Sequence, residues 1–360
     1  MSTRDFHNIY NLTDEQLEQL DKAEEMLEVQ HLNSAEELLL EMLEKSPECI
    51  PVLNNLGVFL RRSVKYMDIK WSEIDHTYSH PTTPKAVNKG AKIANSPKEL
   101  AEQTDLIITC LPSPEICAEV MESKEGIING LSKNKIWLEM STTDESEVKR
   151  LGKQVLEKGA IPLDGPVSGG CHRAATGNIA IFVGGERKCF KKILPVLTTM
   201  GREILHTGEL GTASILKVIT NYLASTHLAA LGEAWTVAKK SNLDMNKTFK
   251  GIQVSSGNSF VHETESQVIL NGSYNINFTM DLVEKDMTLF NNLSKKLNIP
   301  LEISPLVLSI FKDAHKKYGS RAWSSMVVKR LEDNCKISFR EKGYPDKLVD
   351  KEKEEKGYEI

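Results

Sequence analysis

The feature that most constrains the fold of this chain is a change of pattern near residue 210. Between about residues 74 and 208, short apolar segments alternate with amphipathic helical segments, whereas beyond 210 only helical spacing continues. The Asp105–Pro112 segment is a continuous apolar run of the kind that is buried in a parallel sheet. Because alternating strands and helices form βαβ units, we expect an α/β, doubly wound (Rossmann-like) domain followed by an all-α domain.

The expected secondary structure follows this division. Ser96 and Pro97 have the preferences of a helix N-cap and a first helical residue, and they open a helix just before the apolar run. Short apolar runs favour strands, and apolar residues spaced three and four apart favour helices. Strands are expected at 135–140 and 161–163, and helices at 114–122, 144–158, 212–238, 245–253, 259–270, 279–296, 301–317 and 323–334.

Residues 13–62 carry helical spacing in three segments. Ala23 and Gly57 are 34 residues apart, which is the period of tetratricopeptide repeats, whose helix pairs stack through small residues. About one and a half such repeats are present, whereas about three are normally needed for an independent solenoid. Two interpretations therefore stand: a tetratricopeptide-like segment over residues 1–65, or a generic amphipathic helical hairpin.

The composition is that of a soluble globular protein of 360 residues, with 40% hydrophobic and 26% charged residues. The net charge of −5 argues against nucleic acid and acidic membrane surfaces as partners. No apolar run approaches the roughly 20 residues of a membrane helix, and the N-terminus lacks the apolar stretch of a secretory signal. We therefore expect a cytoplasmic protein.

The six cysteines are scattered along the chain, without a Cys-x-x-Cys pair. Disulfide frameworks and zinc clusters have tighter spacing. The pattern favours buried free thiols in a reducing compartment, and it offers no candidate metal ligands.

Three motifs carry residues suited to chemistry. The first is Asp164–Gly170, with the sequence DGPVSGG, and the second is Gly208–Gly211, with the sequence GELG, followed by Lys217 and Asn221. The third is Leu282–Asp286, with the sequence LVEKD. In this order they resemble the motifs of the β-hydroxyacid dehydrogenase family, which includes the 3-hydroxyisobutyrate dehydrogenases, and the likeness covers about three quarters of the chain.

The chemistry of these residues agrees with the resemblance. Ser168 supplies a hydroxyl, and Gly169 and Gly170 let backbone amides approach a substrate carboxylate closely, although an ordinary glycine turn after a strand has the same pattern. Lys217 and Asn221 are four residues apart, so they project from one face of a helix. In its apolar neighbourhood, Lys217 is a candidate proton donor and acceptor, and Asn221 would orient it or the substrate.

The resemblance also implies contacts with a nicotinamide cofactor. Leu111, Pro112 and Thr142 follow expected strands, where ligands bind in open α/β sheets, and Lys285 would reach the nicotinamide side. An acidic residue after the second strand would favour NAD, and Ser79–Pro81 at that place contains none. NADP or NAD is expected, with NADP favoured. Family members also imply a homo-oligomer built through the helical domain.

The chain departs from the family pattern at its start. The family opens with a strand, a GxGxxG loop and a helix that bind the cofactor's pyrophosphate, and residues 1–104 contain no such loop. The likeness resumes only near His76, so an incomplete doubly wound domain is expected. The expected organisation is a tetratricopeptide-like segment (1–65), a truncated Rossmann-like NAD(P)-binding domain (66–208), an all-α substrate and dimerisation domain (209–340) and a charged, mobile tail (341–360).

Three hypotheses follow for function. The first is an oxidoreductase that transfers a hydride between NAD(P) and a small 3-hydroxy acid or its semialdehyde, with Lys217 as the acid/base. The second is a catalytically impaired pseudoenzyme that binds a protein partner through residues 13–62. The third is a gene fusion or a misplaced translation start. Cofactor binding without the glycine loop is the property that separates the first two.

Overall fold

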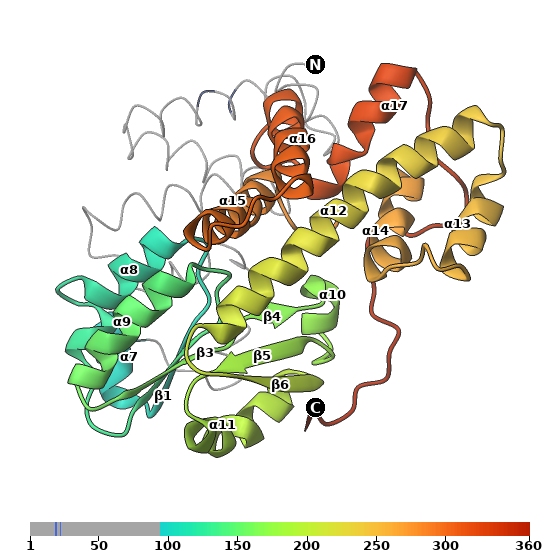
Figure 1. The fold of residues 1–360 in the computed structure, drawn as a ribbon. Helices are drawn as coiled ribbons and strands as arrows, with labels where there is room; N and C mark the ends of the chain where they lie inside the picture. The colour runs from blue at the N-terminus through green and yellow to red at the C-terminus, as the bar shows by residue number, and fades with distance from the viewer. Residues whose placement is uncertain (1–18, 20–21, 23–93) are drawn as a thin grey trace. The chain divides into compact units, whose positions relative to one another are not determined.

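The computed structural model describes Gln19, Lys22 and residues 94–360 (Figure 1). Gln19 and Lys22 are helical. The rest of the expected helices in 13–62, the place of the glycine-rich loop and Cys49 lie outside the described residues. Contacts divide the chain into two compact units. Within the described residues, one unit comprises 94–107 and 119–133, and the other comprises 108–118 and 134–360.

The smaller unit holds helix α7 (Pro97–Gln103) and the 3₁₀ helix η2 (Ile127–Asn129). The Ser96 hydroxyl accepts a hydrogen bond of 3.1 Å from the backbone N–H of Glu99, and Pro97 is the first helical residue. The predicted start of this helix is therefore confirmed. Strand β1 and helix α8 each contribute residues to both units.

The larger unit contains most of a mixed sheet. Its strand order is β1-β2-β3-β5-β6-β7, and β4 pairs with β5 beside this path. The pairs β2 and β3, β5 and β6, and β6 and β7 are parallel. Strands β3 and β5 run antiparallel and pair at Asp164 and Gly184, and β4 and β5 are also antiparallel. The strands are β1 (Leu106–Thr109), β2 (Ile136–Glu139), β3 (Ile161–Asp164), β4 (Val167–Ser168), β5 (Ala180–Gly184), β6 (Glu203–Gly208) and β7 (Tyr358–Glu359).

Apolar side chains from the strands and their helices form the core of the sheet region. Strand β2 is buried at every position, as expected of a strand covered on both faces. Trp137, Leu163, Ile181 and Phe190 are fully buried. The helices that belong to the sheet region are α8 (Pro114–Glu122), α9 (Glu145–Glu157), α10 (Gly170–Ala174) and α11 (Arg187–Met200).

Beyond β6 the chain is helical as far as residue 335. The 29-residue helix α12 runs out from the sheet, as Figure 1 shows, and packs against α14, α15, α16 and α17. The predicted helices lie within about two residues of the observed ones, except that the last is divided into η3 and α17. The elements are α12 (Thr212–Lys240), α13 (Met245–Gln253), α14 (Phe260–Asn271), α15 (Met280–Lys296), α16 (Ile303–Tyr318), η3 (Ser324–Val327) and α17 (Lys329–Cys335).

The C-terminal segment corrects the expectation of a mobile tail. Strand β7 extends β6 in parallel, and the Tyr358 N–H donates to the Arg202 carbonyl at 2.9 Å. Asp350 accepts hydrogen bonds from Thr176 and Asn178. The charged composition suggested a solvated, mobile segment, but arginines of the sheet region pair with its glutamates in three ion pairs: Arg173 with Glu352, Arg187 with Glu359, and Arg202 with Glu355.

The five described cysteines are free thiols, but two of them correct the expectation of burial. Cys117 and Cys189 are buried and Cys335 is half-buried, whereas Cys110 and Cys171 are exposed. Cys110 directly follows β1 and Cys171 lies in the short helix α10, so both occupy the rim of the sheet and not its core. In the described part of the chain, no helix has the length and apolarity needed to cross a membrane, and no cluster of His, Cys, Asp or Glu could hold a metal ion.

Candidate active site

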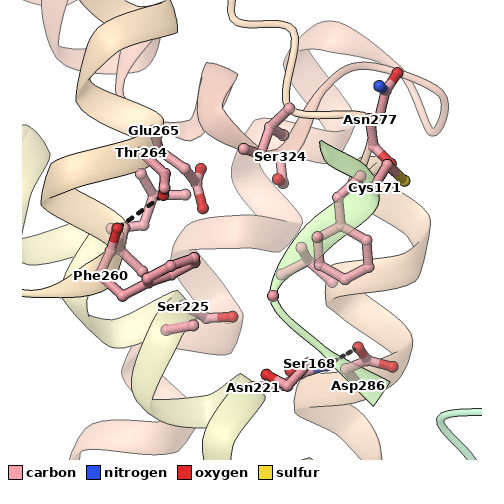
Figure 2. Close-up of a pocket in the computed structure, with 18 of the residues that line it drawn as sticks. Ser168, Cys171, Asn221, Ser225, Phe260, Thr264, Glu265, Asn277, Asp286 and Ser324 are labelled. Carbon is pink, nitrogen blue, oxygen red and sulfur yellow. Dashed lines mark hydrogen bonds between the residues drawn. The ribbon is translucent and has the colours of Figure 1, made fainter. Parts of the chain in front are cut away.

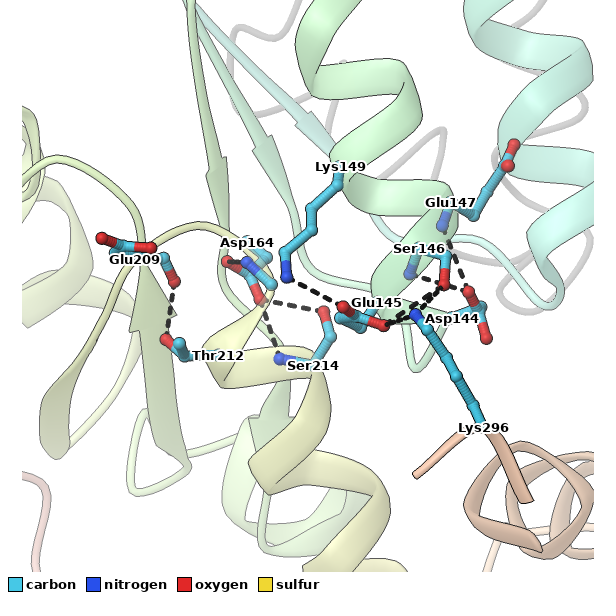
Figure 3. Close-up of polar contacts among 11 residues, drawn as sticks. Asp144, Glu145, Ser146, Glu147, Lys149, Asp164, Glu209, Thr212, Ser214 and Lys296 are labelled. Carbon is cyan, nitrogen blue, oxygen red and sulfur yellow. Dashed lines mark hydrogen bonds and ion pairs between the residues drawn. The ribbon is translucent and has the colours of Figure 1, made fainter. Parts of the chain in front are cut away.

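The helix that carries the predicted catalytic residues is anchored to the sheet by Asp164. One carboxylate oxygen of Asp164 accepts from the Gly211 N–H at 2.8 Å, and the other accepts from the Ser214 N–H and hydroxyl at 2.8 and 2.9 Å (Figure 3). Burial raises the pKa of Asp164 in spite of these bonds. Gly184 lies so close that a Cβ there would approach Asp164 Oδ1 to 2.4 Å. The first and second sequence motifs therefore meet at the start of α12.

A chain of hydrogen bonds links the two helices that carry the second and third motifs. Lys217 Nζ donates to Asn221 Oδ1 at 2.9 Å, and Asn221 Nδ2 donates to Asp286 Oδ2 at 2.5 Å. Lys285 Nζ lies 2.8 Å from Asp286 Oδ1 in an ion pair without hydrogen-bond geometry. Lys217 is only 8% exposed and Asp286 only 2%. The Lys217 ammonium is thus held in one position by the half-buried amide of Asn221, which the buried carboxylate of Asp286 fixes in turn.

The environment of Lys217 changes its protonation. Removal from solvent disfavours the charged ammonium and lowers the pKa of Lys217 to about 8. The negative charge of Asp286 opposes this shift, and the positive charge of Lys285 adds to it. The neutral and protonated forms of Lys217 are therefore both accessible near neutral pH, as a group that accepts and returns a proton requires.

Of the residues predicted to contact a cofactor, Leu111, Pro112 and Thr142 follow β1 and β2, and Lys285 lies in α15. Lys285 Nζ donates to the Thr142 carbonyl at 2.6 Å, and the Leu111 N–H donates to the Ser141 hydroxyl at 2.6 Å. Pro112 follows Leu111 and is half-buried. The structure thus connects Lys285 with Thr142 and holds the loop after β1 against the loop after β2. Ligands of open α/β sheets bind at this carboxyl edge.

Lys217 lines a cavity of about 260 Å³. Figure 2 shows this cavity in close-up. The predicted substrate residues and both predicted catalytic residues line it, and so does Thr142; Leu111, Pro112 and Lys285 do not. The rest of the wall is largely apolar. Its lining includes Ser168, Gly169, Gly170, Lys217, Asn221, Asp286, Leu228, Phe260, Glu265, Phe278, Phe311 and Ser324.

The Ser-Gly-Gly segment is a turn that faces this cavity. Ser168 ends β4 and Gly170 begins α10. Gly169 and Gly170 have φ angles of +132° and +82°, a backbone region that residues with a Cβ rarely adopt. The segment is therefore both the glycine turn after a strand and a wall of the cavity. The glycine turn is therefore confirmed, and binding of a substrate carboxylate by this loop stays a prediction.

His262 and Asp286 both make hydrogen bonds whose partners the structure reveals. His262 is fully buried, and its ring bonds the Phe249 carbonyl at 3.0 Å and the Ser266 hydroxyl at 3.1 Å, so both ring nitrogens have partners within the protein. Asp286 ends the Leu282–Asp286 motif, but the sequence pattern indicates no role for it. Its bond to Asn221 spans 65 positions, and no spacing rule in a single sequence could have revealed that contact.

Comparison with known proteins identifies the family. Residues 55–208 match the profile described as the NAD binding domain of 6-phosphogluconate dehydrogenase. Residues 211–331 match the profile described as NAD-binding of NADP-dependent 3-hydroxyisobutyrate dehydrogenase. The 2-(hydroxymethyl)glutarate dehydrogenase of Eubacterium barkeri is 31% identical over 70% of this chain and 84% of that protein. The chain belongs to the β-hydroxyacid dehydrogenase family, among proteins similar to 3-hydroxyisobutyrate dehydrogenase.

A second relative and a solved structure agree with this assignment. The mitochondrial 3-hydroxyisobutyrate dehydrogenase of Mus musculus is 31% identical over 66% of this chain and 73% of that enzyme. The crystal structure of 3-hydroxyisobutyrate dehydrogenase from Salmonella typhimurium has 25% sequence identity and a TM-score of 0.62, and it covers 69% of this chain and 89% of that one. The predicted Rossmann-like sheet followed by a helical domain is confirmed.

Proposed function

We propose that this protein is an NAD(P)-dependent dehydrogenase of small 3-hydroxy acids, with Lys217 as its acid/base. The observation that carries the proposal is the environment of Lys217, which is buried, bonded to Asn221 and has a pKa lowered to about 8 at the wall of a cavity. A residue with these properties can exchange a proton with a substrate oxygen at the pH of the cell.

Each residue of the site has a distinct role in the proposal. Ser168 and the amides of the following glycine turn bind the substrate carboxylate. In the oxidative direction, neutral Lys217 accepts the proton of the substrate hydroxyl at Nζ; in the reductive direction, protonated Lys217 donates it to the carbonyl oxygen. Asn221 orients Lys217, and Asp286 fixes Asn221 through the bond of 2.5 Å.

The loops after β1 and β2 suit the nicotinamide end of a cofactor. The Thr143 hydroxyl is buried there without a hydrogen-bond partner, which leaves a polar group for a ligand to satisfy. Leu111, Pro112, Thr142 and Lys285 would hold this end. A nicotinamide cofactor bound here would supply hydride-transfer chemistry at the carbinol carbon of the substrate. NADP is proposed ahead of NAD because no acidic residue stands in Ser79–Pro81.

The relatives narrow the proposed substrate. The compounds for which the two relatives are named, 2-(hydroxymethyl)glutarate and 3-hydroxyisobutyrate, share one head group. That head is a carboxylate whose neighbouring carbon carries a hydroxymethyl group. We infer that the substrate of this chain has the same head, with its carboxylate at Ser168 and its hydroxymethyl group at Lys217.

Cofactor titration is the first test of the proposed function. The full-length chain is titrated with NADPH and then NADH, and the fluorescence of the reduced nicotinamide is followed. Saturable binding at micromolar concentration is expected, with NADPH bound more tightly. No binding of either by a folded protein would overturn the proposal and favour a pseudoenzyme that acts through residues 13–62.

Substitution of Lys217 tests its role directly. Lys217→Ala is expected to reduce turnover by about 10²- to 10⁴-fold, the usual contribution of an acid/base group, while cofactor binding is retained. Lys240→Ala is the matched control, because Lys240 is exposed on the same helix. Equal turnover in the two variants would remove Lys217 from the mechanism.

A further inference from the structure

Two polar groups of the cavity wall have no partner in the protein. Glu265 of α14 lines the cavity, and its Oε2 is shielded from solvent and makes no hydrogen bond. The Ser324 hydroxyl, in η3, is also unbonded, although the residue is only 1% exposed. Buried polar groups are nearly always hydrogen-bonded. Two orphaned groups at one cavity therefore indicate that a ligand completes their bonding.

Glu265 and Ser324 come from elements that contact each other. Helix α14 packs against η3, and the Ser325 hydroxyl donates to the Tyr274 carbonyl, just beyond α14, at 2.6 Å. In the view of Figure 2, both residues lie on one side of the drawn side chains, and Ser168, Asn221 and Asp286 lie on the other. The cavity thus has a second polar region, apart from the one that holds Lys217.

The surroundings set the charge of this second region. Glu265 has no ion-pair partner among the described residues, and burial raises its pKa to about 8. Near neutral pH the carboxyl is mostly protonated, so it offers one O–H donor together with acceptor oxygen. Ser324 also offers a donor and an acceptor. The second polar region is consequently neutral and can both give and accept hydrogen bonds.

We propose that Glu265 and Ser324 form a subsite for a neutral hydroxyl group of the substrate, remote from the reacting carbon. This inference rests on the proposed function for the orientation of the substrate head. A hydroxyl can donate to one of the two groups and accept from the other, so that all three are satisfied. The substrate is then a 3-hydroxy acid with a further hydroxyl at its far end, and Glu265 and Ser324 determine specificity.

Charged alternatives fit the same region less well. A remote ammonium would require Glu265 to lose its proton in a largely apolar wall. A second carboxylate would lie away from the donors that Ser168 and the glycine turn offer to the first, and the only Lys, Arg or His residues among the described residues of the lining are Lys217 and His172. Burial lowers the pKa of His172 and disfavours its charged form. Lys217 is already assigned to the reacting carbon. A hydroxyl group can bind in this region without any change in the charge of Glu265.

Four probes with one head and different far ends test this subsite. They are 2-(hydroxymethyl)butanoate, its 4-hydroxy and 4-amino derivatives, and 2-(hydroxymethyl)glutarate. Binding to the full-length chain is measured by calorimetry, and kcat/KM is measured with NADP. The 4-hydroxy probe is expected to bind about 10- to 100-fold more tightly than the parent, because the parent leaves the buried hydrogen-bonding groups of Glu265 and Ser324 without partners.

Variants then assign this preference to the two residues. Glu265→Leu is expected to reduce the ratio between the 4-hydroxy and parent probes to about one, and Ser324→Ala to reduce it about fivefold. Glu265→Gln keeps a donor and an acceptor, so it should retain the ratio within a few fold. Glu263→Gln, exposed on the same helix, is the matched control and should leave the ratio unchanged.

The outcomes separate this inference from the proposed function. Equal binding of the parent and 4-hydroxy probes, or a preference for the amine or the glutarate, would overturn the hydroxyl subsite even if turnover is observed. Preferential binding of the 4-hydroxy probe without turnover of any probe would support the subsite and contradict the dehydrogenase. Absence of binding by all four probes would overturn the subsite.

Discussion

The two polar regions of the cavity differ in how completely the protein satisfies them. Around Lys217, side chains from two helices form a continuous set of bonds that includes Asn221, Asp286 and Lys285. Around Glu265 and Ser324, polar atoms are buried without partners. In this cavity, the region that transfers a proton and the region that selects the substrate therefore differ in structure. The group that moves a proton is positioned in advance, whereas the groups that select a substrate remain available to it.

The largest expected effect concerns the anchor that positions the reactive region. Asp164→Ala leaves the Gly211 and Ser214 amides without their acceptor and is expected to lower the free energy of unfolding by about 2–4 kcal/mol. Urea unfolding at pH 7 measures it. Asp144→Ala, which removes the half-exposed cap of α9, should cost only about 1 kcal/mol. Equal losses would mean that Asp164 is an ordinary cap.

A second substitution tests the bonds around Lys217 without removing the amine. Asp286→Asn removes the negative charge that favours protonated Lys217. We expect kcat to fall about 10- to 100-fold and the pKa of Lys217 to fall below its value in the native protein. The pH dependence of oxidative kcat/KM reports that shift. If kcat fell while the pH profile stayed unchanged, Asp286 would have only a structural role.

The native protein should show the titration of Lys217 in both directions. Because the neutral amine is the base, oxidative kcat/KM is expected to rise about tenfold per pH unit up to a pKa of about 8 and then level off. Reductive kcat/KM should be flat below this pKa and fall above it, because the protonated form is the acid. A flat oxidative profile between pH 6 and 9 would contradict the assignment.

The smallest effect concerns the unsatisfied region. A carboxyl whose pKa is raised on folding destabilises the folded state above the pKa of the unfolded chain, and the cost grows until the folded pKa of about 8 is reached. Glu265→Gln should therefore raise Tm at pH 7 by about 2–4 °C, for roughly 1 kcal/mol, and have little effect near pH 4. Glu263→Gln should not change Tm at either pH. Equal Tm values for Glu265→Gln and the native protein at pH 7 would show that Glu265 is solvated.

Local patterns were sufficient to predict much of the fold. The helix spacing beyond residue 210 placed α12 to α16 within about two residues, because amphipathic periodicity and caps are encoded locally. The apolar run at β1 and the glycine turn after Ser168 were predicted for the same reason. The antiparallel pair β3 and β5 was not predicted, since strand direction depends on contacts between distant residues.

The site could be predicted only where a motif carried it. Lys217 and Asn221 are neighbours on one helix, and their bond of 2.9 Å follows from their spacing of four residues. Glu265 has no comparable signal, because a glutamate on an amphipathic helix normally faces water. Its place in the cavity wall depends on how α14 packs against η3, and that packing is a tertiary property that the sequence pattern does not state.

The C-terminal strand has a consequence for handling the protein. Without β7, the backbone of β6 at Glu203 and Ile204 would be an open edge on which a strand of another molecule could pair. Gly357 lies close against the backbone of Gly201. A Cβ atom at position 357 would come within 1.9 Å of the Gly201 carbonyl oxygen, so only glycine allows β7 to pair here. Removing residues 350–360, or placing a bulky tag at Ile360, would therefore expose this edge and promote aggregation.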